Sequence, residues 1–181
     1  MDEETAALAL RARQGDRAAF GALYERYAGL VHGVLLSLVS VAEAQDLVQE
    51  VFLAALRRQG HLEDPGRFGA WIATIARNRG RDALRARREV EPLDAGAGSE
   101  PAAPAGHAAE ADDAEEAARA LEAVRSLPEA YREPLLLRLV EGLSGPEIAN
   151  RTGMTHGSVR VNLCRGMKLL RERLAAEARS E

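Results

Sequence analysis

The sequence feature that most constrains the fold is a pair of short helical patterns near the C-terminus, separated by a tight break. The first pattern follows Ser144, whose side chain can cap a helix, and Glu147 stands three residues later, at the capping-box spacing. Gly153 can adopt the left-handed conformation that ends a helix and turns the chain. We therefore predict a helix over 145–152 and a second, longer helix capped by Thr155, which together form a helix-turn-helix.

The second helix of this pair has two different faces. Apolar or small residues recur at spacings of three and four and form the inward face: Val159, Leu163, Gly166, Leu170 and Leu174. The outward face combines positive charge with short polar side chains: Thr155, His156, Ser158, Arg160, Val161, Asn162, Cys164, Arg165 and Lys168. Such a helix fits the major groove of DNA, where Arg can bind guanine or hold a phosphate. A solvated amphipathic helix would have a similar pattern, but the preceding short helix and Gly turn favour DNA binding.

The formal net charge of −4 is unexpected for a DNA-binding protein until it is divided along the chain. Residues 1–88 carry 13 Arg and 11 acidic residues, and residues 119–181 carry 11 basic and 8 acidic residues. Residues 89–118 carry 9 acidic residues and no Lys or Arg, and are rich in Ala, Gly and Pro. A segment of this composition cannot bury a core. We therefore predict two small helical domains, 1–88 and 119–181, joined by a flexible acidic linker at 89–118.

The N-terminal domain reads as three helices. Apolar residues keep helical spacing from Asp16 to Leu38, over 41–58, and again from Phe68 onward. The second of these helices carries a polar outward strip that includes Asp46, and the Gly- and Pro-containing stretch 59–66 reads as a loop. The third helix runs into a segment with six Arg against one acid at 77–88. Aromatic residues beside Arg suit single-stranded nucleic acid, although Phe68 also reads as a core anchor.

Three blocks of sequence cover both domains: DLVQEVF at 46–52, FGAWIATIARN at 68–78, and LPEAYREPLLLRLVEGLSGPEIA at 127–149. In this order and at this separation they resemble the bacterial RNA polymerase sigma factors, specifically the compact extracytoplasmic-function group. The resemblance implies a protein that binds core RNA polymerase and directs promoter-specific initiation. The first domain would dock on the clamp helices of the largest subunit and open the −10 element, and the second would read the −35 element as duplex. An anti-sigma factor is a further implied partner.

The resemblance also assigns roles to matching residues. The residues that would contact the polymerase are Asp46, Gln49 and Glu50. The −10 element would meet the loop from Gly60 to Arg67, which receives a flipped base, and a basic group on the third helix; the residues concerned are Gly60, His61, Leu62, Arg67, Arg77, Asn78 and Arg81. The −35 element would meet Thr155, Ser158, Arg160, Val161, Cys164, Arg165 and Lys168. Val161, Asn162, Cys164 and Met167 depart from the residues that members more often carry, so a typical −35 sequence is not expected.

Other functional classes find little support. No apolar run reaches the 18 residues of a membrane span, and acidic residues stand where a signal peptide would be basic, so we expect a cytoplasmic protein without membrane insertion. One cysteine, no ligand spacing among four His and no catalytic motif predict a non-enzyme without metal or cofactor. The alternative is a one-component regulator with a helical sensor domain before its helix-turn-helix. A sensor would need a ligand pocket, whereas the N-terminal helices offer an acidic strip, a loop and an Arg run.

Overall fold

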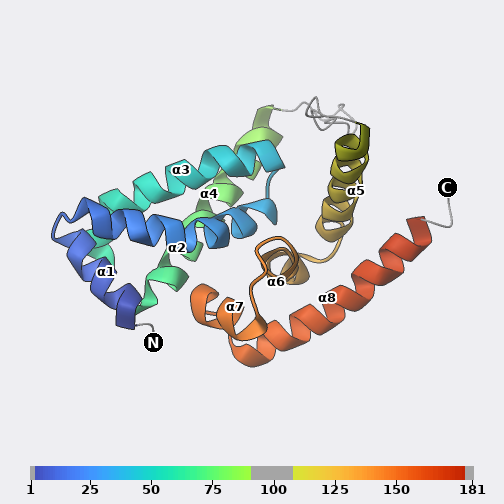
Figure 1. Cartoon of the computed structure of the whole chain (residues 1–181). Helices are drawn as coiled ribbons and strands as arrows, with labels where there is room; N and C mark the ends of the chain where they lie inside the picture. The colour runs from blue at the N-terminus through green and yellow to red at the C-terminus, as the bar shows by residue number, and fades with distance from the viewer. Residues whose placement is uncertain (1–2, 91–107, 178–181) are drawn as a thin grey trace.

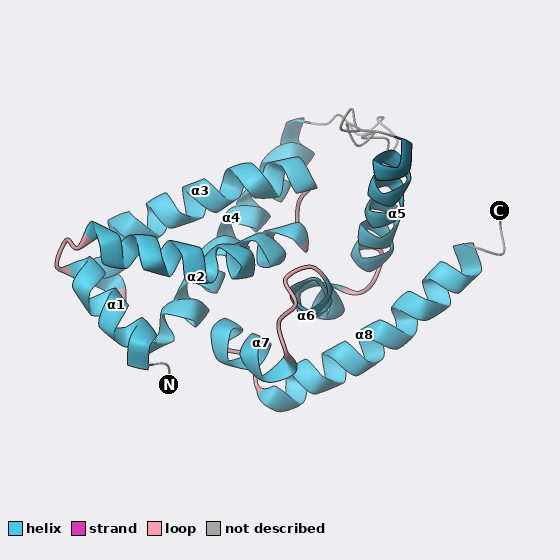
Figure 2. Cartoon of the chain, viewed as in Figure 1, coloured by secondary structure: helices cyan, strands magenta, loops and turns pink. Residues whose placement is uncertain are grey.

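Helices form all the regular structure in the computed structural model, which describes residues 3–90 and 108–177 (Figures 1 and 2). The first half contains α1 (Glu3–Arg13), α2 (Arg17–Leu36), α3 (Val41–Arg58), the 3₁₀ turns η1 (Gln59–His61) and η2 (Pro65–Arg67), and α4 (Phe68–Val90). The second half contains α5 (Ala108–Arg125), α6 (Glu129–Leu139), α7 (Gly145–Thr152) and α8 (His156–Glu177). The prediction of an all-α fold is confirmed for the described residues.

Side-chain caps fix where α2 and α3 begin. Asp16 caps α2 by accepting a hydrogen bond from the Ala19 amide at 3.0 Å, and this bond lowers the pKa of its carboxyl. Ser40 caps α3 in the same way. The three-four spacing of α2, α3 and α4 buries one apolar stripe from each helix in a shared core, whose fully buried members include Leu23, Leu30, Val34, Val51 and Ile72.

Aromatic rings from α2 and α4 pack together in this core. Phe68 is buried, and its ring centroid lies 5.2 Å from that of Tyr27 and 5.7 Å from that of Trp71. The interpretation of Phe68 as a core anchor is therefore confirmed, because offset ring packing of this kind stabilises a core. The hydroxyl group of Tyr27 lies 3.0 Å from that of Thr5, which ties α1 to α2.

Two helical segments were not predicted. α1 has small buried residues, Ala9 and Ala12, in place of large apolar ones, so its periodicity is weak. α5 begins at Ala108, within the segment expected to be a flexible linker, and residues 108–118 are helical. That expectation is wrong for these residues because Ala and Glu are strong helix formers whose propensity outweighs the repulsion of their charges. The rest of the expected linker, 91–107, lies outside the described residues.

The two halves of the chain pack against each other, a contact that no pattern in the sequence predicted. Figure 1 shows α6 and α7 between the first bundle and α8, and α6 contacts α2 while α7 contacts α4. Arg125, the last residue of α5, donates hydrogen bonds to the carbonyls of Leu36, which ends α2, and of Val39 just beyond it. Burial in this contact lowers the pKa of Arg125, which still places a cation at a helix C-terminus, where it is favourable.

Candidate nucleic-acid interface

The helix-turn-helix is built as its sequence predicts. Ser144 accepts a hydrogen bond from the Glu147 amide and Glu147 accepts one from the Ser144 amide, so the capping box is complete. The Ser144 hydroxyl also donates a hydrogen bond to the Glu147 carboxylate at 2.6 Å, and this bond, followed by the one from the Ser144 amide, lowers the pKa of Glu147. Gly153 ends α7 with φ of 77°, in the left-handed region that favours glycine. Thr155 then accepts a hydrogen bond from the Ser158 amide at 3.1 Å and caps α8.

The inner face of α8 packs on α6 through small and apolar residues. Val159, Gly166 and Leu170 are buried, as their spacing predicted. A Cβ atom at Gly166 would lie 2.9 Å from Leu135 Cδ1 and 3.1 Å from Tyr131 Cβ, so a larger residue here would have to displace these neighbours on α6. Leu174, also predicted to face inward, is 38% exposed, because α8 extends past its packing partners at the C-terminal end (Figure 1).

The outer face of α8 is open to solvent. All seven residues predicted to meet the −35 element are exposed: Thr155, Ser158, Arg160, Val161, Cys164, Arg165 and Lys168. Among the described residues, Arg160 and Arg165 form no ion pair, and Lys168 forms one with Glu172 at 3.9 Å. Two free guanidinium groups with short polar neighbours can bind base edges or phosphates without first breaking a contact.

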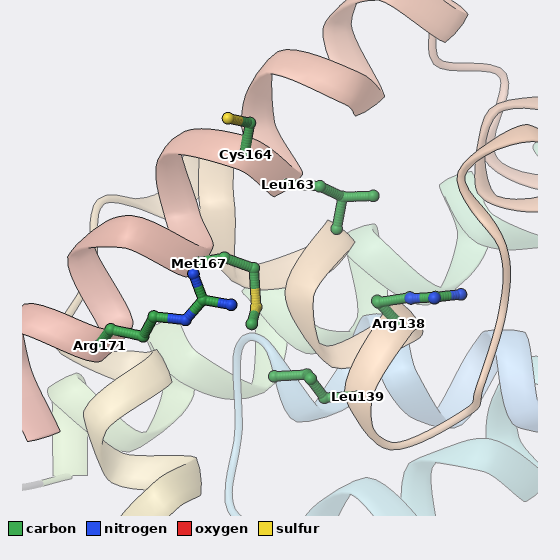
Figure 3. A pocket seen from close by; sticks show the side chains of 6 residues that line it. All are labelled: Arg138, Leu139, Leu163, Cys164, Met167 and Arg171. Carbon is green, nitrogen blue, oxygen red and sulfur yellow. The ribbon is translucent and has the colours of Figure 1, made fainter.

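A shallow groove of about 340 Å³ runs beside this face, between α6 and α8 (Figure 3). Its lining is apolar with two arginines at its rim: Arg138, Leu139, Leu163, Cys164, Met167 and Arg171. Figure 3 shows Met167 of α8 and Leu139 of α6 directed into the groove, while the Cys164 thiol points away from it. Helical periodicity did not predict this groove. Leu139 and Val140 belong to the apolar run at the end of α6, which reads as core in the sequence, yet they are 49% and 52% exposed.

The predicted docking strip on α3 is also exposed. Asp46, Gln49 and Glu50 all face solvent, and Glu50 lies 4.0 Å from Arg79, too far to hold it firmly. Beside the strip lies an apolar hollow of about 270 Å³, lined by Phe20, Tyr24, Gln49, Phe52, Leu53 and Leu56. Leu53 and Leu56 are 52% and 42% exposed and were missed by the sequence reasoning. Their three-residue spacing beside the acidic strip is the signal that could have identified them.

The residues predicted to meet the −10 element differ in their surroundings: five are exposed, one is buried and one is held in an ion pair. Gly60 and His61 in η1, Arg67 in η2, and Asn78 and Arg81 on α4 are exposed. Leu62 is 7% exposed, and its side chain is buried in the core. Arg77 is paired: its Nε and Nη2 donate to Glu133 of α6 at 2.9 and 2.8 Å. These hydrogen bonds raise the pKa of Arg77 above its ordinary value, against the opposing effect of burial.

The described residues contain no group of three or more His, Cys, Asp or Glu side chains that could hold a metal ion. None of the described helices is both long enough and apolar enough to cross a membrane.

Two family models match the chain, one in each half. Sigma-70 region 2 matches residues 23–90, and Sigma-70 region 4 matches residues 117–170. The sequence is 40% identical over 166 residues to the RNA polymerase sigma factor CarQ of Myxococcus xanthus, covering 91% of this chain and 94% of CarQ. It is 35% identical to the ECF RNA polymerase sigma factor RpoE of Cereibacter sphaeroides, covering 88% of each chain.

The fold also resembles a solved structure, CnrH in complex with the cytosolic domain of CnrY. The match to that structure has a TM-score of 0.67 at 26% sequence identity and covers 96% of this chain and 98% of the other.

Proposed function

The chain belongs to the extracytoplasmic-function group of RNA polymerase sigma factors, non-enzymatic proteins that direct promoter-specific transcription initiation, and we propose that it divides this task between its two halves. Residues 1–88 would bind core polymerase and open the −10 element, and residues 119–181 would read the −35 element. The one-component regulator is not favoured, because the first half matches a sigma region. We assign the protein to the cytoplasm, where its polymerase partner works.

The exposed outer face of α8 is the observation that carries this proposal. It presents Arg160 and Arg165, which form no ion pair among the described residues, beside the short side chains of Val161 and Cys164, so a groove edge can approach the helix closely. Thr155 and Ser158 stand at the helix N-terminus, where amide groups favour a backbone phosphate. Lys168 lies further along and would contact phosphate. The matched family and this geometry support the same role.

The docking surface on α3 supports the role of the first half. Asp46 and Glu50 lie one helical turn apart on an exposed face, where they can meet basic groups of the clamp helices. Gln49 stands between them and also lines the apolar hollow that includes Leu53 and Leu56. An acidic strip beside an exposed apolar hollow offers both charge pairing and apolar burial to one partner.

An anti-sigma factor is the further partner that we propose. The likeness to CnrH, whose structure was solved in complex with the cytosolic domain of CnrY, supports it, because the match extends over nearly the whole of both chains. The exposed apolar surfaces on α3 and beside α8 are suited to such a partner.

Reconstituted transcription tests the proposed function. Purified core RNA polymerase with this chain should start transcription at discrete sites on fragments of the source genome, and core enzyme alone should not. The variant Asp46→Lys/Glu50→Lys should weaken polymerase binding by about 2–4 kcal/mol while keeping its helicity. Absence of specific initiation on every fragment, together with no binding to core enzyme, would refute the proposal.

A further inference from the structure

α1 precedes the part of the chain that matches Sigma-70 region 2, which begins at residue 23. It is nevertheless part of the first bundle, because it contacts α2, α4 and the η2 turn. The η2 turn belongs to the loop from Gly60 to Arg67, which the proposed function assigns to the flipped base of the −10 element. α1 therefore packs against the segment that would read DNA.

The inward face of α1 consists of small residues. Thr5, Ala9 and Ala12 follow one another at spacings of four and three, and all three are buried. The distance between packed helices is set by the side chains at their contact, so residues of this size let α1 lie close to its neighbours. Thr5 is the polar member of the three, and a buried hydroxyl group needs hydrogen-bond partners.

The hydroxyl group of Thr5 has such partners on α2. Its Oγ1 atom lies 3.0 Å from the hydroxyl oxygen of Tyr27. The guanidinium group of Arg26 donates from Nη1 to Thr5 Oγ1 at 3.2 Å and from Nη2 to Glu4 Oε2 at 2.6 Å. Two successive residues of α1 are thus bound by two successive residues of α2. A satisfied buried polar group of this kind specifies one arrangement of the two helices.

Tyr27 connects Thr5 to the loop. The centroid of its ring lies 5.2 Å from that of Phe68, the first residue of α4. A Cβ atom at Gly69 would lie 2.8 Å from Tyr27 Cε1, so the ring lies directly against the start of α4. The Phe68 amide in turn donates a hydrogen bond to the carbonyl of Pro65, where η2 begins. A continuous set of contacts therefore leads from α1 to the η2 turn.

The hydrogen bonds within the loop are local. The Asp64 side chain accepts from the Gly66 amide at 2.9 Å, and the Asp64 carbonyl accepts from the Arg67 amide at 3.0 Å. These bonds shape η2 but do not attach it to the bundle. Leu62 and Phe68 are buried on either side of the turn. Between them, and apart from α4, which it joins, the helix on which η2 packs is α1.

We propose that α1 is part of the −10 reader, and that Thr5 is a positioning residue that holds η2 where the loop receives the flipped base. A binding site must be held to a fraction of an ångström by residues that do not touch the ligand, and a pocket for a flipped base reads its edge through such precise contacts. The proposal rests on the proposed function, because that function makes the loop a base contact. It adds residues that lie outside the Sigma-70 region 2 match.

Three substitutions and a matched control test this role. Thr5→Val keeps the shape of the side chain and removes the hydroxyl group, whereas Thr5→Ser keeps the hydroxyl group and should behave as wild type. Arg26→Met removes the guanidinium group from a partly exposed position, so it should fold even if Thr5→Val does not. The control is Ser37→Ala, which removes another buried hydroxyl group of the first half; this group donates to the Val34 carbonyl at the C-terminal end of α2.

Two measurements are made on each variant. Hydrogen–deuterium exchange of the free chain reports how firmly the loop is held, because amides exchange when the local structure opens. Holoenzyme assembled from core polymerase is then titrated with four fluorescent −10 single strands that differ only in the flipped base, taken from a promoter mapped by reconstituted transcription. The measured quantity is the ratio of affinities between the preferred base and the next best. Loss of folded protein lowers all four affinities alike and leaves this ratio unchanged.

Thr5→Val and Arg26→Met should speed the exchange of amides within 62–67 and lower the base ratio, each about fivefold. This factor corresponds to about 1 kcal/mol, the net contribution of one hydrogen bond. Thr5→Ser and Ser37→Ala should change neither quantity by more than about twofold.

An unchanged base ratio in both Thr5→Val and Arg26→Met, with or without faster exchange, would show that α1 only stabilises the fold and would overturn the proposal. The wild-type holoenzyme separates this failure from that of the proposed function. If it initiates transcription but prefers no base at this position, the assignment of the loop is wrong and the positioning role of Thr5 falls with it. If it does not initiate at all, the proposed function itself is refuted.

Discussion

The outer faces of α8 and α4 carry the same chemistry in different settings. On α8, Arg160 and Arg165 are exposed and form no ion pair among the described residues. On α4, Arg77 is bound by Glu133, and Arg81 lies 3.2 Å from Glu129. Both faces are basic in the sequence, yet Arg160 and Arg165 are available to a ligand, whereas Arg77 and Arg81 would first have to lose a contact. The availability of a basic residue is therefore set by tertiary packing as much as by its identity.

The largest expected effect concerns the open face. Arg165→Ala should weaken binding to −35 duplex by about 1–3 kcal/mol and relax preference at one base pair, if Arg165 contacts guanine. The free energy of unfolding should change by no more than about 0.5 kcal/mol, because Arg165 is exposed.

Affinities for a set of single-base −35 variants at two salt concentrations provide the measurement. A uniform loss on all sequences, with the salt slope shallower by about one, would mean that Arg165 holds phosphate only. Unchanged affinity on every variant would remove Arg165 from the interface.

Removing the acidic partner of the basic face on α4 should have the opposite effects: a loss of stability and no loss of affinity for −35 duplex. Glu133→Ala should lower the free energy of unfolding by about 1.5 kcal/mol, because it leaves a half-buried guanidinium group without its partner. Binding to −35 duplex should not weaken, since Glu133 lies away from the outer face of α8. Urea denaturation and duplex titration of the same preparation measure both quantities. A variant as stable as wild type would show that this pair contributes no net stability.

The local support of the open face can be tested at the capping box. Ser144→Ala removes the side-chain cap of α7 and should cost about 1 kcal/mol of stability, measured by denaturant unfolding. The distance between spin labels on Cys164 and on a Gln14→Cys substitution should remain that of wild type, because the hydrogen bonds of the cap join Ser144 to Glu147 within the second half. If the distance changed, the two halves would be coupled through α7 more strongly than the contacts indicate.

The smallest effect is expected at the edge of the basic face on α4. Glu129 and Arg81 are 66% and 50% exposed, so Glu129→Ala should cost at most about 0.5 kcal/mol, and less at high salt. Thermal unfolding at two ionic strengths measures it. A loss of stability as large as that of Glu133→Ala would contradict the expectation that the more buried pair contributes more.

Much of the local structure could be predicted from sequence. The span of α3, the capping box at Ser144, the left-handed Gly153 and the cap at Thr155 all follow from short-range rules, and each is observed. α1 escaped prediction because its buried residues are small, and the start of α5 escaped because an acidic Ala-rich segment resembles a linker in composition.

The candidate site was less predictable from sequence wherever it depends on partners distant in the chain. Helical periodicity placed nine residues on the outward face of α8 and its cap; eight of them are exposed, and Asn162 is half-buried. The pairing of Arg77 with Glu133 spans 56 residues and follows no periodic signal. Leu62 is a similar case: its place in a loop suggested access, but it is buried in the core.

In the free chain Glu133 binds Arg77, and we expect this contact to open in the promoter complex. One distance tests this expectation most directly. Spin labels on Cys164 and Gln14→Cys can be measured in the free chain and again in holoenzyme assembled on a promoter fragment. We predict a single short distance in the free chain and a much longer one in the promoter complex. Equal distances in the two states, or a broad long distribution in the free chain, would contradict the account.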